Sequence, residues 1–151
     1  MSSSSYTYKY PRPMVTVDIL LLRKVRGKYQ LLLIQRGQSP YHGKWALPGG
    51  YVDLDESLES AARRELFEET NIRDIPFRQL GAFGDPGRDP RGHTVTVVYG
   101  GIIPPNTRLK AIAKDDAANL SWHPLDKLPG LAFDHKTCLL YTSPSPRDSI
   151  A

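Results

Sequence analysis

Apolar and β-branched positions fall into short runs along this chain, and turn residues separate one run from the next. Residues 14–24 have the sequence MVTVDILLLRK, and residues 29–36 have the sequence YQLLLIQR after an Arg-Gly-Lys turn. Such runs favour buried strands, and the tight turn between them favours antiparallel pairing. A third short strand is expected over 45–47, just before a Pro-Gly-Gly turn.

The second half of the chain repeats this pattern after one helical segment. Ser57 is a suitable N-cap, and a helix is expected from there to about Thr70. Further strands are predicted over 77–83, 93–103 and 120–123, with loop over 104–118 and a helical turn over 125–128. Strands placed around a central helix predict an α/β (α+β) fold, an α/β/α sandwich with a mixed central sheet.

Composition divides the chain into three parts. With 151 residues and 40% hydrophobic content, it suits one domain with a substantial core. Residues 1–12 are rich in Ser and Tyr and are predicted to be a loose arm, and the domain proper is placed at 13–137. The tyrosines of the arm, Tyr6, Tyr8 and Tyr10, are candidates for a homodimer interface.

The tail over 138–151 departs from the composition of a domain. Residues 131–135 are predicted to begin a C-terminal helix, but CLLYTSPSPRDSIA follows, and two Ser-Pro pairs stop a helix. This string resembles a translated sequencing adaptor, and a natural disordered tail is the alternative. We therefore expect the native domain to end near Lys136 or Thr137, with its second helix truncated.

Charge and cysteine content restrict the classes of partner. The net charge is +4, but the Lys and Arg residues are scattered along the chain. A small phosphorylated substrate therefore accounts for the positive charge as well as nucleic acid does. Nucleic acid is therefore not expected as the main partner. The apolar runs are too short for a membrane span, no secretory signal is present, and the one cysteine, Cys138, fits a reducing compartment. We expect a cytoplasmic protein.

Candidate chemistry is concentrated at the end of the predicted helix. Glu65, Glu68 and Glu69 fall within roughly 100° of one another on its surface. Like charges at this spacing repel, and anions near a helix C-terminus oppose the macrodipole. A shared cation would explain the cluster. The alternative is a solvated helix with Glu59–Arg63 and Arg64–Glu68 pairs.

The segment GGYVDLDESLESAARRELFEETNI, residues 49–72, carries a family resemblance. The residues that carry it are, in order, Gly50, Glu56, Arg64, Glu65, Leu66, Phe67, Glu68, Glu69, Thr70, Asn71 and Ile72. This arrangement resembles the signature of the Nudix hydrolases. The one departure is Asn71, where the family has Gly; Asn is the best replacement for Gly in a left-handed conformation at a helix end.

The resemblance implies a hydrolase that needs Mg²⁺ or Mn²⁺. By the resemblance, Glu65, Glu68 and Glu69 hold the metal together with the backbone carbonyl of Gly49. Glu56 is then a further catalytic residue, either as a ligand or as support, and Arg64 orients a glutamate. The expected reaction is hydrolysis of a nucleoside diphosphate-linked substrate, with a carboxylate as general base.

The loop over 83–94 suggests the substrate. Its sequence, FGDPGRDPRGHT, and residues 131–135 resemble the ADP-ribose pyrophosphatase group of the family. The candidate substrate-binding residues are Arg36, Arg88, Arg91 and Asp116, the last of which is also a candidate for a late acidic group near the metal. ADP-ribose would yield AMP and ribose 5-phosphate.

Two other functions remain alternatives. One is a pyrophosphatase of (deoxy)nucleoside triphosphates. The other is the ligand-sensing module of a regulator of NAD metabolism, in which case a DNA-binding domain outside this sequence would make nucleic acid a partner. Among the remaining candidates, Trp45 and Trp122 are expected in the core, with stacking on adenine as the alternative, and His93 and His123 are expected on the surface or in packing.

Overall fold

The computed structural model describes residues 5–114 and 117–142. The elements along the chain are β1 (Met14–Val25), β2 (Lys28–Arg36), β3 (Trp45–Ala46), β4 (Gly49–Tyr51), α1 (Leu58–Thr70), β5 (Arg78–Phe83), β6 (Thr94–Ile102), β7 (Ala117–Pro124) and α2 (His135–Thr142). The strands predicted from the sequence are present within a few residues of their expected bounds. Strand β4 was not predicted, and residues 125–128 form a turn without helix.

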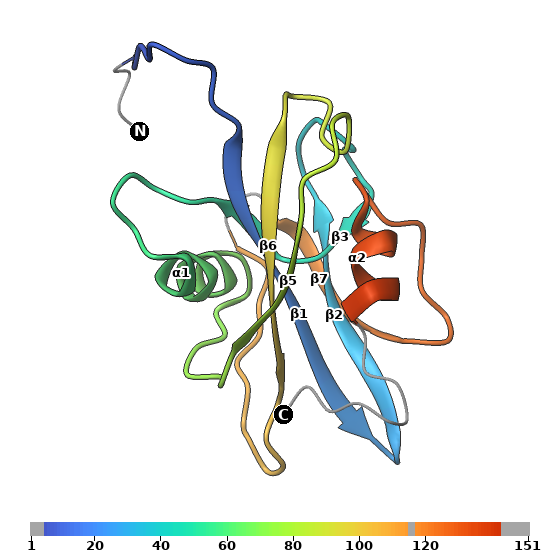
Figure 1. Cartoon of the computed structure of the whole chain (residues 1–151). Coiled ribbons are helices and arrows are strands. Elements are labelled where there is room, and N and C mark those ends of the chain that lie inside the picture. Colours follow the sequence, from blue (N-terminus) through green and yellow to red (C-terminus); the bar gives the residue numbers. More distant parts are fainter. Residues whose placement is uncertain (1–4, 115–116, 143–151) are drawn as a thin grey trace.

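Strand β1 is the centre of one seven-stranded mixed sheet. It runs parallel to β6, with Met14 opposite Thr94 at one end and Leu22 opposite Ile102 at the other. It pairs antiparallel with β2 and with the short β4. The sheet order is β3-β2-β1-β6-β5, with β7 added on β2 (Figure 1).

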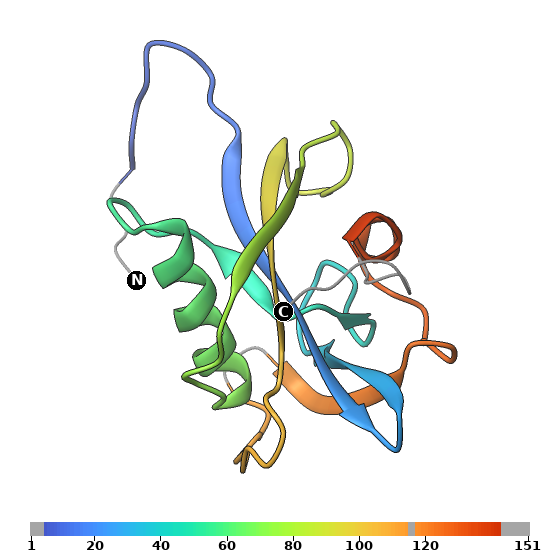
Figure 2. The ribbon, with the colours of Figure 1, turned by 60° about the horizontal axis from the view of Figure 1, so that its bottom comes forward.

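The two helices cover opposite faces of this sheet, as Figures 1 and 2 show from two directions. Because side chains alternate across a strand, Val17, Ile19 and Leu21 of β1 pack toward α1, whereas Leu20 and Leu22 pack toward α2. All five are fully buried. The predicted α/β/α sandwich with a mixed sheet is therefore confirmed.

Helix α1 has the ends that the sequence predicts. The Ser57 hydroxyl accepts a hydrogen bond from the Ser60 amide at 3.1 Å, which is the N-cap contact. At the other end Asn71 takes a left-handed conformation, with φ 64°, and its amide donates to the Phe67 carbonyl at 2.9 Å. The departure from the family signature is thus compatible with the turn that Gly would make.

Helix α2 extends five residues past the boundary expected at Thr137. It continues to Thr142 and buries Cys138 and Leu139 in the core on its side of the sheet. The sequence predicted a C-terminal helix truncated near Thr137; the structure continues it to Thr142, because the first Ser-Pro pair, at 143–144, leaves room for two turns before it. The rest of the expected tail, 143–151, lies outside the described residues.

The structure describes the N-terminal arm from residue 5 onward. Residues 5–13 form no strand or helix, and the side chains of Tyr6, Tyr8 and Tyr10 are exposed. Among the residues described, neither helix has the length and apolar content that crossing a membrane requires.

Candidate active site

A cavity of about 480 Å³ lies beside the C-terminal half of α1 and the central strands. One wall carries the carboxylates of α1, and another carries arginines and aromatic rings from the ends of β2 and β4 and from the loops before β6 and α2. The residues that line it are Thr16, Asp18, Ile34, Arg36, Gly37, Gln38, Ser39, Leu47, Gly49, Gly50, Tyr51, Asp53, Arg64, Glu65, Glu68, Glu69, Arg88, Asp89, Arg91, Phe133 and His135.

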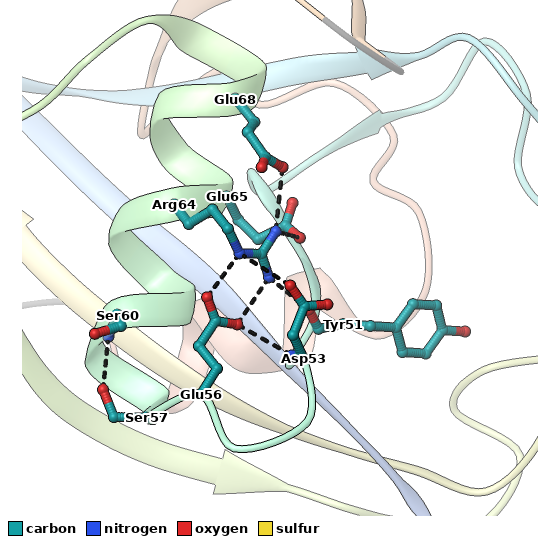
Figure 3. A network of polar contacts seen from close by, with 8 residues as sticks. All are labelled: Tyr51, Asp53, Glu56, Ser57, Ser60, Arg64, Glu65 and Glu68. Atoms are coloured by element: carbon teal, nitrogen blue, oxygen red, sulfur yellow. Dashed lines mark hydrogen bonds and ion pairs between the residues drawn. The ribbon is translucent and has the colours of Figure 1, made fainter. Parts of the chain in front are cut away.

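Arg64 lies at the centre of the acidic wall (Figure 3). Its Nη1 donates to Glu65 at 2.9 Å and to Glu68 at 3.1 Å. Its Nε and Nη2 bind the two oxygens of Glu56 at 2.7 and 2.9 Å, and Nη2 also donates to the Tyr51 carbonyl. These five hydrogen bonds match the five N–H donors of a guanidinium. Arg64 therefore orients three glutamates at once.

Glu56 is held behind the cavity wall. Besides the two hydrogen bonds from Arg64, its carboxylate accepts one from the Asp53 amide at 3.0 Å, and these contacts hold its pKa below the usual range. Glu56 is not among the cavity-lining residues. The sequence left open whether Glu56 is a metal ligand or a supporting residue. Its position outside the cavity favours a supporting role, in which it holds Arg64.

The two glycines before the acidic loop allow the carboxylates to approach the backbone. A Cβ on Gly50 would lie 2.5 Å from the Glu65 carboxyl carbon, and one on Gly49 would collide with the Val17 carbonyl and with an oxygen of Asp18. The Gly49 amide also donates to Glu69 at 2.8 Å. A side chain at Gly50 would displace the Glu65 carboxylate, and one at Gly49 would collide with the backbone of β1, so both positions require Gly.

Burial raises the pKa of two of the three cluster carboxylates. The pKa of Glu69 rises to about 8, because burial and the charges of Glu65 and Asp18 outweigh the Gly49 hydrogen bond and Arg36. Burial also raises the pKa of Glu65, against the opposing effect of Arg64. Without a cation these groups are reluctant to ionise, so a divalent ion that binds them would displace protons, and its affinity would rise with pH.

The donor set fits a hard divalent cation. Mg²⁺ and Mn²⁺ prefer carboxylate and carbonyl oxygens, and the acidic wall offers three carboxylates next to the Gly49–Gly50 backbone. In the described part of the chain, no three acidic, His or Cys side chains already converge as a ligand set. Arg64 bridges Glu65 and Glu68 instead, so binding of a cation would require these two side chains to turn toward the ion.

The opposite wall is built around Phe133. The Arg36 guanidinium lies 5.0 Å from the centre of its ring and that of Arg91 lies at 5.4 Å, both within cation–π range. Arg91 also lies 5.0 Å from the Tyr51 ring and forms a two-pronged ion pair with Asp89. Two of the predicted substrate-binding residues, Arg36 and Arg91, therefore reach the same side of the cavity.

Arg88, the third predicted substrate residue, has a mainly structural partner. Its Nε and Nη2 bind the two oxygens of Asp134 at 2.9 and 2.6 Å, and its side chain is only 4% exposed. It still lines the cavity. Asp116, the fourth, lies outside the described residues.

Three further cavity residues were not proposed as site residues from the sequence, although Phe133 and His135 lie in the 131–135 segment that resembles the ADP-ribose pyrophosphatase group. Asp18 and His135 are buried and face each other across the cavity floor, and Phe133 lies between the arginines. Burial opposes ionisation of Asp18, but contacts with His135, Thr96 and Arg88 together hold its pKa below the usual range. The signals in the sequence were the polar Asp18 inside an apolar strand and the family-like segment over 131–135.

The two tryptophans and the histidines His93 and His123 do not line the cavity. Trp45 packs edge-on against His123, and Trp122 packs against the α1-side core beneath Arg23. His93 contacts the Gly84 carbonyl through Nε2. The Glu59–Arg63 and Arg64–Glu68 pairs both form, so the helix surface has those ion pairs in addition to the cluster.

Comparison with known proteins agrees with this geometry. A family model for the NUDIX domain matches residues 12–141. The ADPR responsive transcriptional repressor NtrR of Acinetobacter baylyi is 39% identical over 134 residues, which are 86% of this chain and 53% of the repressor. The ADP-ribose pyrophosphatase of Methanocaldococcus jannaschii is 39% identical over 132 residues, which are 84% of this chain and 71% of that enzyme.

A solved structure extends the likeness. The NUDIX domain of Shewanella oneidensis NrtR, crystallised with ADP ribose, superposes with a TM-score of 0.79 at 33% identity, over 90% of each chain. The chain thus spans nearly all of that isolated domain but only about half of the repressor. The family resemblance noted in the sequence is confirmed.

Proposed function

The chain belongs to the Nudix family, and we propose that it is a Mg²⁺- or Mn²⁺-dependent pyrophosphatase that hydrolyses ADP-ribose to AMP and ribose 5-phosphate. The observation that carries the proposal is the cavity with two opposed walls, one of carboxylates and one of arginines and aromatic rings. The 39% identity to an ADP-ribose pyrophosphatase supports the choice of substrate.

The acidic wall would supply the catalytic part. Glu65, Glu68 and Glu69, with the Gly49 carbonyl, would hold the cation, and we call these four groups the metal platform. The bound ion would neutralise the diphosphate and lower the pKa of a bound water. Arg64 would keep the glutamates in place, since hydrolysis of a phosphoanhydride depends mostly on positioning and charge stabilisation.

Glu68 is the carboxylate most accessible to a substrate. Its side chain is 41% exposed, against 13% for Glu65, and Arg64 contacts only one of its oxygens. It lines the cavity, so it lies where a general base could take a proton from the attacking water. We therefore place Glu68 in the catalytic group as well as in the metal platform.

The basic wall would bind the substrate. Arg36 and Arg91 carry positive charge over the Phe133 ring and face the cavity that the carboxylates share. A guanidinium binds phosphate oxygens with two parallel hydrogen bonds, so these side chains suit a diphosphate or a terminal ribose phosphate. The negative substrate would then lie between the cation and the arginines.

The test is AMP formation from ADP-ribose with Mg²⁺ present and absent, with NADH and an oxidised dGTP assayed in parallel. We expect AMP only with the metal and a clear preference for ADP-ribose. A preference for the triphosphate would overturn the substrate assignment in favour of nucleotide sanitation. No turnover of any of the three would overturn the enzyme assignment.

A sensing function is the second candidate, and the 39% identity to a transcriptional repressor supports it. All the signature carboxylates are present here, which favours catalysis over sensing alone. Calorimetry with ADP-ribose in the presence of Mg²⁺ separates the two. Tight saturable binding with no AMP released would favour the sensor, whereas continuous heat from turnover would favour the enzyme.

A further inference from the structure

Four consecutive residues, 132–135, lead into α2, and two of them, Phe133 and His135, line the cavity. The Ala132 amide donates to the Trp45 carbonyl at 2.8 Å, and Phe133 lies under the arginines. Asp134 forms the two-pronged pair with Arg88, and His135 is 3% exposed at the cavity floor. The contacts of His135 differ from the others because they reach the backbone next to the metal platform.

His135 uses both ring nitrogens. The Leu47 amide donates to Nδ1 at 3.0 Å, so Nδ1 is the acceptor and the ring proton is assigned to Nε2. Nε2 then lies 3.4 Å from Oδ1 of Asp18, whose other oxygen accepts from the Thr96 hydroxyl at 2.5 Å. The imidazole thus connects α2 to the β3–β4 connection through Leu47 and to β1 through Asp18.

The segment that His135 holds at Leu47 leads directly into Gly49. The Pro48 carbonyl accepts from the Ile19 amide at 2.8 Å, and Gly49 pairs with Asp18 across the sheet. On its other side the Gly49 amide donates to Glu69. Leu47 and Asp18, the two groups that contact His135, are therefore the groups that fix the position of Gly49 relative to the glutamates.

We propose that His135 is a positioning residue of the metal platform: by accepting the Leu47 amide, it sets the position of Gly49 and, through Gly49, the orientation of Glu69. This inference rests on the proposed function, because it assigns the platform to a cation. Groups that orient metal ligands through a second contact commonly change metal affinity about 10–100-fold when removed. The effect of His135 should therefore appear in metal binding itself.

Two substitutions distinguish the contact of His135 Nδ1 with Leu47 from the contact of its Nε2 with Asp18. In His135→Asn the side-chain oxygen occupies approximately the place of Nδ1 and can still accept from Leu47. In His135→Gln the amide nitrogen occupies approximately the place of Nε2, which preserves the contact with Asp18 and removes the acceptor for Leu47. Leu139→Ala is the control for packing, since Leu139 belongs to the same buried cluster as Leu47 but takes part in neither the Leu47–His135 nor the Asp18–His135 contact.

The experiment is a titration of each full-length variant with Mn²⁺, followed by electron paramagnetic resonance of the unbound ion, with thermal unfolding measured in parallel. We expect the dissociation constant to rise about tenfold in His135→Gln and to stay within about twofold of wild type in His135→Asn. Leu139→Ala should lower the melting temperature and leave Mn²⁺ affinity unchanged.

Any other pattern overturns the inference. Equal weakening in the Asn and Gln variants would mean that the Leu47 contact is not the relevant one, and weakening in Leu139→Ala would mean a general effect of stability. If the wild-type protein binds Mn²⁺ and the Gln variant binds it equally well, only the inference fails. If the wild-type protein neither binds Mn²⁺ nor hydrolyses ADP-ribose, the proposed function fails with it.

Discussion

Arg64 and Glu56 form a two-pronged ion pair, with Nε and Nη2 at 2.7 and 2.9 Å from the two carboxylate oxygens. This contact fixes the plane of the guanidinium, and the fixed plane directs Nη1 at Glu65 and Glu68. The pair raises the pKa of Arg64 and lowers that of Glu56, so both stay charged at neutral pH. A residue outside the cavity therefore determines how residues inside it are oriented.

Arg64→Lys should disrupt this arrangement while keeping the charge. An ammonium cannot reproduce the planar fork, so it cannot hold Glu56 with two bonds and also bridge Glu65 and Glu68. We expect a loss of about 1–3 kcal/mol in the free energy of unfolding, measured by urea denaturation, together with weaker Mn²⁺ binding. Wild-type Mn²⁺ affinity in the Lys variant would contradict the orienting role.

Glu68→Gln should abolish metal-dependent turnover without unfolding the protein. The side chain is 41% exposed and its substitution removes one ion pair with Arg64, so stability should change by about 0.5 kcal/mol or less. The rate of AMP release should fall about 10²–10⁴-fold. Glu59→Gln, on the same helix and paired only with Arg63, is the control. Retained activity in the Glu68 variant would refute its assignment to the metal platform.

The stability of the metal-free protein should fall as pH rises from about 4.5 to 8. In this window the folded state keeps a proton on Glu69, whose pKa is about 8, while the unfolded state has lost it above the ordinary value of 4.5. The folded state thus binds more protons, and its stability decreases with pH. Urea unfolding in chelator at several pH values measures the slope.

Glu69→Gln is the variant that isolates this effect. The slope should become shallower but not vanish, because the pKa of Glu65 is raised in the same direction. Addition of Mn²⁺ at pH 8 should restore stability to the wild-type protein, since a ligand that binds only the folded state stabilises it. An unchanged slope in the Gln variant would mean that Glu69 is not the group responsible.

Arg88→Ala should destabilise the fold by about 3 kcal/mol, because it leaves the Asp134 carboxylate without its partner in a largely buried position. Asp134→Ala should cost a similar amount. The double variant should lose less than the sum of the two, and chemical denaturation of all four proteins gives the coupling free energy. Additive losses would show that the two residues do not act as a pair.

The parts of the structure that depend on local chemistry could be predicted from the sequence. Ser57 and Asn71 mark the ends of α1 because capping is decided by one or two neighbouring residues. The carboxylate cluster could be predicted for the same reason, since helical spacing alone brings Glu65, Glu68 and Glu69 together.

Contacts between distant segments could not be predicted in this way. Leu47 and His135 are 88 residues apart, and their hydrogen bond exists only because α2 packs across the sheet from α1. Strand β4 was missed because Gly is a poor strand former, and only pairing with β1 makes it one. The pairing of Arg88 with Asp134 could not be predicted either, because the two residues are 46 positions apart in the sequence. Arg88, which the sequence suggested as a phosphate ligand, therefore forms a buried ion pair.

Asn71 does more than reproduce the glycine turn that it replaces. Its side-chain amide donates to the Lys110 carbonyl at 2.9 Å, a bond that Gly could not make. Nearby, the amides of Ile112 and Lys114 donate to the last carbonyls of α1, at Thr70 and Glu69. These donors offset the negative end of the helix dipole next to the carboxylate cluster. Asn71, the single departure from the family signature, therefore holds the loop over 110–114 against the end of α1. The amides of this loop reduce the unfavourable interaction between the helix dipole and the glutamates.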